Sequence, residues 1–170
     1  VLGDNSLSDT RPKRSQHSVL RVIGDLVREG APGAADHAPS NGLFDLLQQL
    51  ERIARPGTRI FLISDFHDLL EADNLSPLRR LARRTQLVGI AVNDRLEAEL
   101  PRSGHYSVTD GDHHSSLDTG ADSIREAYAS QYRSNQDLTA RRLRELRIPL
   151  LKINTGDDPL KRLLTVFPAR

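Results

Sequence analysis

Polar and acidic residues follow three apolar segments of the sequence, and their types and positions suit the binding of a ligand or a metal ion. The candidates are Ser64, Asp65, His67, Asp68, Asp94 and the segment 154–158 (Asn-Thr-Gly-Asp-Asp). Ligands of open α/β sheets bind beyond the carboxyl ends of the strands, and carboxylate and hydroxyl oxygens can hold a hard cation such as Mg²⁺. The same residue types cap helices and form turns. The pattern therefore leaves open both a binding edge and a purely structural role.

Residues 110–114 (Asp-Gly-Asp-His-His) contain the Asp-His-His string of one class of metal phosphoesterases. The string lies in a polar segment, whereas a metal-binding string of that class should follow a buried strand. The EF-hand alternative fails because the loop that begins at Asp110 has Ser115 where glycine is needed and Ala121 where glutamate is needed. We therefore expect no metal site there.

The commonest catalytic signatures are absent from the sequence. It contains no Gly-x-Ser-x-Gly elbow, phosphate-binding loop, dinucleotide fingerprint or His-Glu-x-x-His motif. It also contains no cysteine, which excludes thiolate nucleophiles, zinc ribbons, iron–sulfur sites and disulfides. These absences favour a binding function over catalysis.

Three apolar segments indicate strands of a parallel sheet: 59–64, 87–92 and 150–154. They are continuous rather than alternating runs, as in strands that are covered on both faces. Helical spacing of apolar residues predicts helices at about 19–27, 43–54, 75–84, 122–147 and 159–167. Asp122-Ser123 is the expected cap of the fourth helix, and an alternating segment predicts a β-hairpin at about 104–119. This order of elements predicts an α/β protein.

The composition is that of one globular domain and gives no general attraction for nucleic acid. The 170 residues are 37% hydrophobic, and 24 basic residues balance 23 acidic ones. Arginines nevertheless form two helix faces, Arg79, Arg80, Arg83 and Arg84 in one, and Arg141, Arg142, Arg144 and Arg147 in the other. Because only 4% of residues are aromatic, we expect these faces to be solvated or to contact an acidic protein rather than nucleic acid.

No apolar run approaches the roughly 20 residues that a membrane span requires. We therefore expect a cytoplasmic location for this piece, with membrane association only through other parts of the full-length protein. The chain begins at Val1 and contains no methionine. We interpret these two features as the sign of a piece cut from a longer protein.

The order of motifs along the chain resembles one bacterial family. The motifs are Ile63-Ser64-Asp65-Phe66, Asn93-Asp94-Arg95-Leu96-Glu97, Leu100-Pro101, Gly104, Asp110, Asp118-Thr119, Ile124-Arg125, Tyr128, Thr155, Asp158-Pro159, Leu163-Leu164 and Phe167. In this order they resemble the domain-of-unknown-function family 58, which is similar to von Willebrand factor A domains and is commonly encoded beside MoxR-type AAA+ ATPases. The resemblance covers nearly the whole chain.

The resemblance implies both a fold and a function. The implied fold is an α/β, von Willebrand factor A-like (Rossmann-like) three-layer sandwich, truncated at the N-terminus and carrying the inserted hairpin. Residues 1–170 would form a single, partial domain. The implied function is that of a non-catalytic protein-interaction module, not an enzyme, which works with a MoxR-type AAA+ ATPase or its client in protein assembly or maturation.

Von Willebrand factor A domains often hold Mg²⁺ at a metal-ion-dependent adhesion site, built from an Asp-x-Ser-x-Ser loop, a threonine and an aspartate. The resemblance places Asp65, with Ser64 beside it, at the aspartate position. Phe44 stands near the threonine position, and the Asp-x-Ser-x-Ser loop is missing. We therefore expect no bound cofactor in this chain and Mg²⁺ only in the full-length protein.

In the resembling fold, an upstream strand would lie beside Arg59–Ser64, and its loss would leave that segment with a bare edge. Exposed strand edges invite pairing or covering. We expect this edge to pair with another chain, as in a homodimer, or to be shielded by residues 1–14.

Two other functions stay open as hypotheses. The first is a metal-dependent hydrolase of phosphoesters with Asp65, His67, Asp68 and Asp94 as ligands, although the sequence shows no nucleophile or base to complete it. The second is nucleic-acid binding through the arginine faces, whose affinity would fall steeply with salt. An upstream Asp-x-Ser-x-Ser segment and a neighbouring ATPase gene would favour the interaction module instead.

Overall fold

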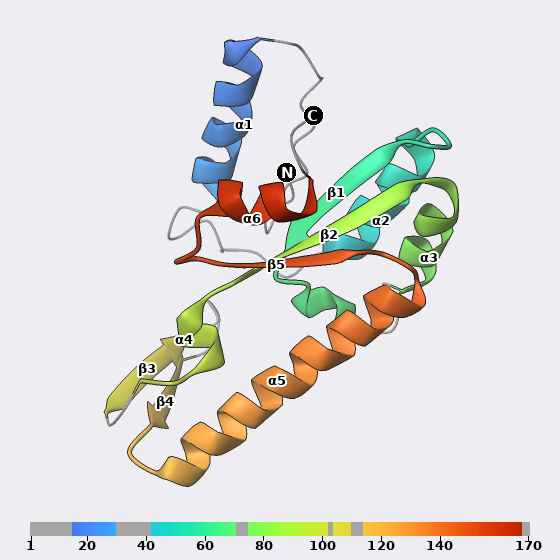
Figure 1. Ribbon diagram of the computed structural model, residues 1–170. Coiled ribbons are helices and arrows are strands. Elements are labelled where there is room, and N and C mark those ends of the chain that lie inside the picture. Colours follow the sequence, from blue (N-terminus) through green and yellow to red (C-terminus); the bar gives the residue numbers. More distant parts are fainter. Residues whose placement is uncertain (1–14, 30–41, 71–74, 102–103, 110–113, 168–170) are drawn as a thin grey trace.

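The computed structural model describes residues 15–29, 42–70, 75–101, 104–109 and 114–167 (Figure 1). The helices in this part of the chain are α1 (Gln16–Glu29), α2 (Gly42–Ile53), α3 (Leu75–Arg84), α4 (Arg95–Ala98), α5 (Asp122–Glu145), α6 (Pro159–Val166) and a short 3-10 helix, η1 (His67–Leu70). The strands are β1 (Arg59–Ser64), β2 (Gln86–Asn93), β3 (His105–Thr109), β4 (His114–Asp118) and β5 (Leu150–Asn154). The elements expected from the sequence are confirmed, and α4 and η1 are additions that the sequence did not predict.

A three-stranded parallel sheet in the order β1-β2-β5 organises the fold. Ile63 of β1 pairs with Ile90 of β2, which pairs in turn with Leu151 of β5. The chain passes through α3 between β1 and β2, and through α5 between β2 and β5, because parallel neighbours need a crossover connection. The predicted α/β class and parallel sheet are therefore confirmed.

Strands β3 and β4 form a separate antiparallel pair beside α4 (Figure 1). His105 lies opposite Asp118, and Thr109 lies opposite His114. This pairing confirms the predicted hairpin. Residues 110–113, which include most of the Asp-Gly-Asp-His-His cluster, lie outside the described residues.

The main core lies on one face of the sheet, under α2, α3 and α5. Leu62 of β1 and Leu87 of β2 point into it, and Leu47 of α2 and Leu143 of α5 have no exposed surface. The other buried members are Leu43, Phe66, Leu69, Leu78, Leu81, Ala91 and Ile148. The apolar residues of α2 and α3 recur at helical spacing, so the periodicity that predicted these helices also identifies their buried sides.

The opposite face of the sheet is covered over β2 and β5 but not fully over β1. Leu163 of α6 packs against a buried cluster formed by Ile90, Leu151 and Ile153. On β1, however, Phe61 is 46% exposed and Ile63 is 67% exposed. The prediction that all three strands are covered on both faces is therefore wrong for β1. The physical reason is that α6 packs over β2 and β5, which leaves these two side chains of β1 partly uncovered.

Helix α5 begins without the cap that the sequence predicted. Its N-cap residue is Ala121, which makes no side-chain capping hydrogen bond. Asp122 lies instead in the first turn of the helix, where its carboxylate pairs with Arg125. A negative charge in the first turn is favoured by the helix dipole, so Asp122 stabilises the start of α5 as a charge and not as a cap.

The apolar side of α1 is largely exposed in the described structure. Five apolar residues are 49–68% exposed: Val19, Leu20, Ile23, Leu26 and Val27. Residues 1–14, which we expected to shield the edge of β1, lie outside the described residues, so the pairing or shielding of that edge stays a prediction. No helix of the described residues is long and apolar enough to cross a membrane.

The substitution Leu143→Ala tests the packing of α5 on the sheet. Because Leu143 has no exposed surface, its truncation leaves a cavity, and we expect the free energy of unfolding to fall by about 2–5 kcal/mol. Urea denaturation followed by circular dichroism measures this change. The matched control is Leu160→Ala, at a side chain that is 64% exposed, which should change stability by less than about 0.5 kcal/mol. Equal losses in the two variants would contradict the packing described.

Candidate functional site

The chain turns sharply at Phe66, directly after the carboxyl end of β1. Phe66 has a left-handed backbone conformation with a φ of 61°, which is uncommon for a residue with a side chain, and it is only 2% exposed. The hydroxyl of Ser64 accepts the backbone N–H of Phe66 at 3.1 Å, and the carboxylate of Asp65 accepts the N–H of His67 at 3.0 Å. The turn therefore buries the Phe66 ring and leaves Asp65 and His67 exposed at the sheet edge.

The two carboxylate oxygens of Asp65 differ in their contacts. Oδ1 accepts both the N–H of His67 and the hydroxyl of Ser64, the latter at 3.2 Å. Within the described part of the chain, Oδ2 has no hydrogen-bond partner. Asp65 thus presents one free acceptor oxygen, held in place by the contacts of the other.

Asp94, at the carboxyl end of β2, is the N-cap of α4. Its Oδ1 accepts the N–H of Leu96 at 2.8 Å, and the side chain of Glu97 accepts the N–H of Asp94 at 3.1 Å, which completes a capping box. Its Oδ2 accepts the hydroxyl of Thr155 at 2.9 Å. Asp94 therefore ties the loop after β2 to the loop after β5.

These contacts lower the pKa of Asp94. The larger cause is the backbone hydrogen bond from Leu96, and the hydroxyl of Thr155 is the second. Hydrogen bonds to a carboxylate favour its charged form. Asp94 is therefore ionised throughout the neutral pH range.

Helix α5 is fixed to the same edge of the sheet through Asn93. The side chain of Asn93, only 5% exposed, accepts the side-chain N–H of Gln136 at 2.8 Å. Its backbone carbonyl accepts the N–H of Thr155 at 3.0 Å. The last residue of β2 thus positions both the middle of α5 and the loop after β5.

Two hollows flank α5 at this edge. The first, which we call the Asp65 hollow, has a volume of about 310 Å³ and is lined by Asp65, Phe66, His67, Glu97, Tyr128, Gln131, Tyr132, Asn135, Gln136 and Thr139. The second, the Asp94 hollow, has a volume of about 760 Å³ and is lined by Asn93, Asp94, Arg95, Ala98, Tyr132, Arg133, Gln136, Asp137, Lys152, Asn154, Thr155 and Gly156. Tyr132 and Gln136 line both hollows, so α5 forms the ridge between them.

Tyr132 lies on this ridge, where its surroundings disfavour ionisation of the phenol. Its pKa is raised, first because the phenol is partly buried, and then because Glu97 and Tyr128 lie nearby. A negative charge on the phenolate is disfavoured beside a carboxylate. The hydroxyl of Tyr132 therefore stays protonated at neutral pH and can donate a hydrogen bond to a ligand.

The structure separates the predicted edge residues into two groups. Asp65 and His67 line one hollow, with Ser64 bonded to Asp65, whereas Asp94 lines the other. The side chain of Asp68 lies outside the part that the structure describes. Among the described residues, no three or more histidine, aspartate or glutamate side chains form a group that could hold a metal ion.

Sequence reasoning missed the contribution of α5 to this site. Tyr128 enters the sequence analysis only as part of the family resemblance. No sequence pattern predicted a binding role for Gln131, Tyr132 or Gln136. A usable signal is present in the sequence, because these polar and aromatic residues recur at spacings of three and four and therefore share one face of the helix. Their position over the carboxyl ends of the strands depends on the crossover from β2 to β5, which the pattern alone does not specify.

The hydrogen bond between Thr155 and Asp94 can be tested by titration. The folded-state pKa of Asp94 lies below its ordinary value of 3.8, so the ionised carboxylate stabilises the fold above about pH 3.8. This contribution is lost as the pH falls through the folded-state pKa. Thr155→Val removes the donor and should raise the midpoint toward 3.8, as measured by the carboxyl ¹³C shift of Asp94. Thr165→Val, which removes a hydroxyl bonded to the carbonyl of Arg162, should leave the midpoint unchanged, and an unchanged midpoint in Thr155→Val would refute the assignment.

Comparison with known proteins gives relatives without an established activity. The chain is 26% identical over 162 residues to an uncharacterized protein of Mycobacterium bovis and to two uncharacterized proteins of Mycobacterium tuberculosis. Each alignment covers 93% of this chain and 48% of the relative, so the chain spans about half the length of the curated relatives that it matches. No solved structure matches the chain significantly. A family match covers residues 1–138, and the chain belongs to that family, which is described as "Protein of unknown function DUF58".

Proposed function

We propose that the chain is a non-catalytic protein-interaction module of von Willebrand factor A-like architecture, which works in the cytoplasm with a MoxR-type AAA+ ATPase or its client in protein assembly or maturation. The named partner and the architecture rest on the order of motifs in the sequence. The observation that carries the interaction function is the Asp65 hollow, in which an oriented carboxylate faces two tyrosines and three amide side chains of α5. The parallel sheet, with this hollow beyond the carboxyl ends of its strands, supports the proposal.

The chemistry of the Asp65 hollow suits a protein partner. The free oxygen of Asp65 can accept a charge-assisted hydrogen bond from a lysine or arginine of the partner. Tyr128, which is 39% exposed, offers an aromatic face, and tyrosine is enriched in the centres of protein interfaces. The amide side chains beside it can both donate and accept.

Mg²⁺ in the full-length protein belongs to the same proposal. Ser64 and Asp65 supply a hydroxyl and a free carboxylate oxygen at one point of the sheet edge. Mg²⁺ prefers six oxygen ligands in octahedral geometry, so other parts of the protein, the partner and water would have to complete the coordination. With Mg²⁺ bound, the free oxygen of Asp65 would ligate the metal instead of a lysine or arginine, and the metal would connect Asp65 to an acidic side chain of the partner.

The geometry does not favour the alternative of a phosphoester hydrolase. Asp65 and Asp94 line different hollows, and both oxygens of Asp94 are engaged by Leu96 and Thr155. The two carboxylates are therefore held by different turns for separate structural tasks. No observation brings them into one ligand set, and we do not propose this activity.

Binding measurements with the intact protein test the proposed function. Isothermal titration with a MoxR-type ATPase from the same genome should give saturable binding, which Asp65→Ala and Tyr128→Ala should each weaken about tenfold, equivalent to about 1.4 kcal/mol. The matched control is Glu126→Ala, at an exposed carboxylate of α5 that lines neither hollow. Undiminished binding by the Asp65 and Tyr128 variants would show that the partner docks elsewhere, and absence of binding by the wild type would remove the ATPase as the partner.

A further inference from the structure

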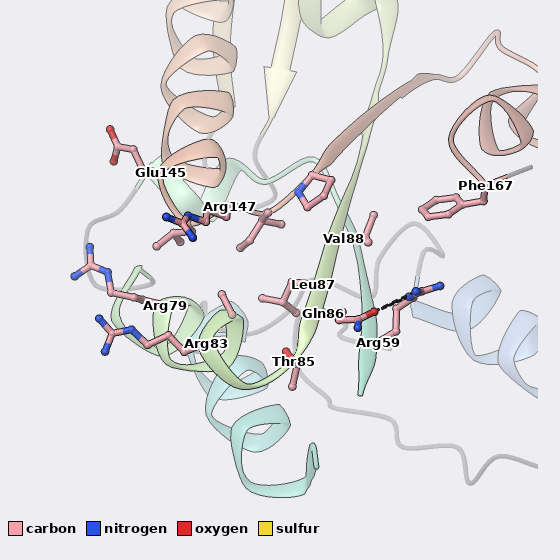
Figure 2. Close-up of a pocket in the computed structure, with 14 residues that line it drawn as sticks. Arg59, Arg79, Arg83, Thr85, Gln86, Leu87, Val88, Glu145, Arg147 and Phe167 are labelled. Carbon is pink, nitrogen blue, oxygen red and sulfur yellow. Dashed lines mark hydrogen bonds between the residues drawn. The ribbon is translucent and has the colours of Figure 1, made fainter. Parts of the chain in front are cut away.

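A large cavity lies at the opposite end of the sheet, beside the amino-terminal ends of the strands (Figure 2). Its volume is about 840 Å³. Its walls come from the start of β2, the last turns of α3, the segment between α5 and β5, and Phe167 after α6. None of its lining residues lines the Asp65 or the Asp94 hollow.

The two arginine faces that the sequence shows separately meet at this cavity. Arg79 and Arg83 of α3 line it together with Arg147, which follows α5 (Figure 2). Within the described residues, these three side chains form no ion pair and no hydrogen bond. They are exposed and available to a ligand.

Other arginines of the same two faces have structural roles instead. Arg80 forms a salt bridge with Glu51 of α2 at 3.0 Å, and Arg84 donates to the backbone carbonyl of Glu51 at 3.5 Å. Arg142 donates to the carbonyl of Leu69. The structure therefore distinguishes arginines that hold helices together, Arg80, Arg84 and Arg142, from three that line the cavity without a partner among the described residues.

The cavity and its surroundings carry a strong excess of positive charge. Among the described residues, four arginines line it against a single acid, Glu145. The fourth arginine, Arg59, is held by the side chain of Gln86 at 3.1 Å. A neighbouring hollow of about 480 Å³ shares Arg147 and adds Arg144 and Lys152 with no acid. Because the whole chain has a net charge of only +1, this excess is local, and it favours an anionic ligand.

At the edge of β2 that faces the cavity, the N–H and C=O of Leu87 have no partner strand among the described residues. β5 pairs with β2 only from Gly89 onward, and the N–H of Gly89 donates to the carbonyl of Pro149 at 2.8 Å. Main-chain hydrogen bonds of a central parallel strand alternate between its two neighbours, so the N–H and C=O of Leu87 point to the same side as those of Gly89. In the described structure, no strand lies opposite the N–H and C=O of Leu87 on that side. Pro149, the residue before β5, has no N–H that could bond to the carbonyl of Leu87.

Apolar groups form the floor of the cavity. The lining includes Leu87, Val88, Ile148, Pro149 and Phe167. A floor of this kind can accept an apolar side chain. The cavity thus combines a charged rim, an open strand edge and an apolar floor.

We propose that this cavity binds an extended acidic segment of a partner protein. Its carboxylates pair with Arg79, Arg83 and Arg147, its backbone bonds to the free main-chain groups of Leu87, and an apolar side chain packs on the floor. Addition of a strand to a free edge, with side-chain pockets beside it, is a recurring mode of peptide recognition. The proposal does not depend on the proposed function, because it concerns the other end of the sheet.

A peptide fits the cavity better than a nucleic acid does. Single-stranded nucleic acids bind through aromatic faces on which bases stack. Phe167 is the one aromatic residue among the described residues of the lining, and its ring already contacts that of Phe61 edge-on, with centroids 5.6 Å apart. The arginines alone would hold a phosphate backbone, but the strand edge and the apolar floor would find no counterpart in it.

Fluorescence anisotropy with labelled ten-residue peptides tests the proposal on the full chain. A peptide of alternating glutamate and leucine should bind at 50 mM salt, at least tenfold more tightly than the glutamine–leucine peptide, and the lysine–leucine peptide should not bind. R79A/R83A and R147A should each weaken binding at least fivefold. R141A is the matched control, because Arg141 is an exposed arginine of α5 that does not line the cavity, and it should bind as the wild type does.

Two further measurements test the main-chain contacts to β2 and the preference for a peptide over a nucleic acid. Methylation of the backbone nitrogens of the glutamate–leucine peptide should weaken binding if its main chain adds to the edge of β2. A ten-nucleotide single-stranded DNA should bind more weakly than the peptide. Equal binding by the arginine variants and the wild type, with melting curves showing that all are folded, would overturn the proposal, as would tighter binding of the DNA or no binding of the acidic peptide.

Discussion

The hydrogen-bonded position of β2 between β1 and β5 is the constraint on which the rest of the structure depends. Where β2 is paired on both sides, its residues bond to the two neighbours in alternation. Its register with β1 is fixed from Gln86 to Ala91, and its register with β5 from Gly89 to Asn93. At its carboxyl end, Asn93 and Asp94 fasten α5, α4 and the loop after β5. At its amino end, the late start of β5 leaves the amide of Leu87 without a strand opposite it. Both candidate binding regions are therefore consequences of how one strand is paired.

The two ends of the sheet differ in the way their charges are balanced. At the carboxyl end, the carboxylates of Asp94 and Asp158 cap α4 and α6 and accept backbone N–H groups there. At the amino end, arginines gather around the ends of α3 and α5. Helices that connect parallel strands run against them, so helix amino termini lie where strands end and helix carboxyl termini lie where strands begin. The carboxylates of the acidic edge are therefore stabilised by backbone N–H groups and, at Asp157 and Asp158, by Arg162 and Lys161. Several arginines of the basic edge, in contrast, have no acidic partner among the described residues.

Much of the fold could be predicted from the sequence, because strands and helices are indicated by local patterns of apolar residues. The apolar runs at 59–64, 87–92 and 150–154 identified the sheet, and helical spacing identified the helices. The sequence did not show that one face of β1 is exposed, since an apolar run is the same whether its second face is covered or not. The small helix α4 was missed because four residues carry too little periodicity, although Asp94 and Glu97 form a recognisable capping box. The convergence of Arg79 with Arg147, and of Asp65 with Tyr132, depends on the crossovers and lies beyond any local pattern.

The helix dipole explains why arginines stand at the basic edge, but it does not explain why the guanidinium donors of several of them have no partner among the described residues. Cations near a helix carboxyl terminus stabilise it by about 0.3–1 kcal/mol at an exposed site, so Arg83 and Arg144 have a reason to stand in the last turns of α3 and α5. Such an interaction with the field of the helix does not occupy the guanidinium donors, because it requires no acceptor within hydrogen-bond distance of them. Arg80 shows the contrasting case, since Glu51 takes its donors directly. A site that only stabilised helices would need no open strand edge and no apolar floor beside its arginines, and their presence together is the reason to assign this end of the sheet a ligand.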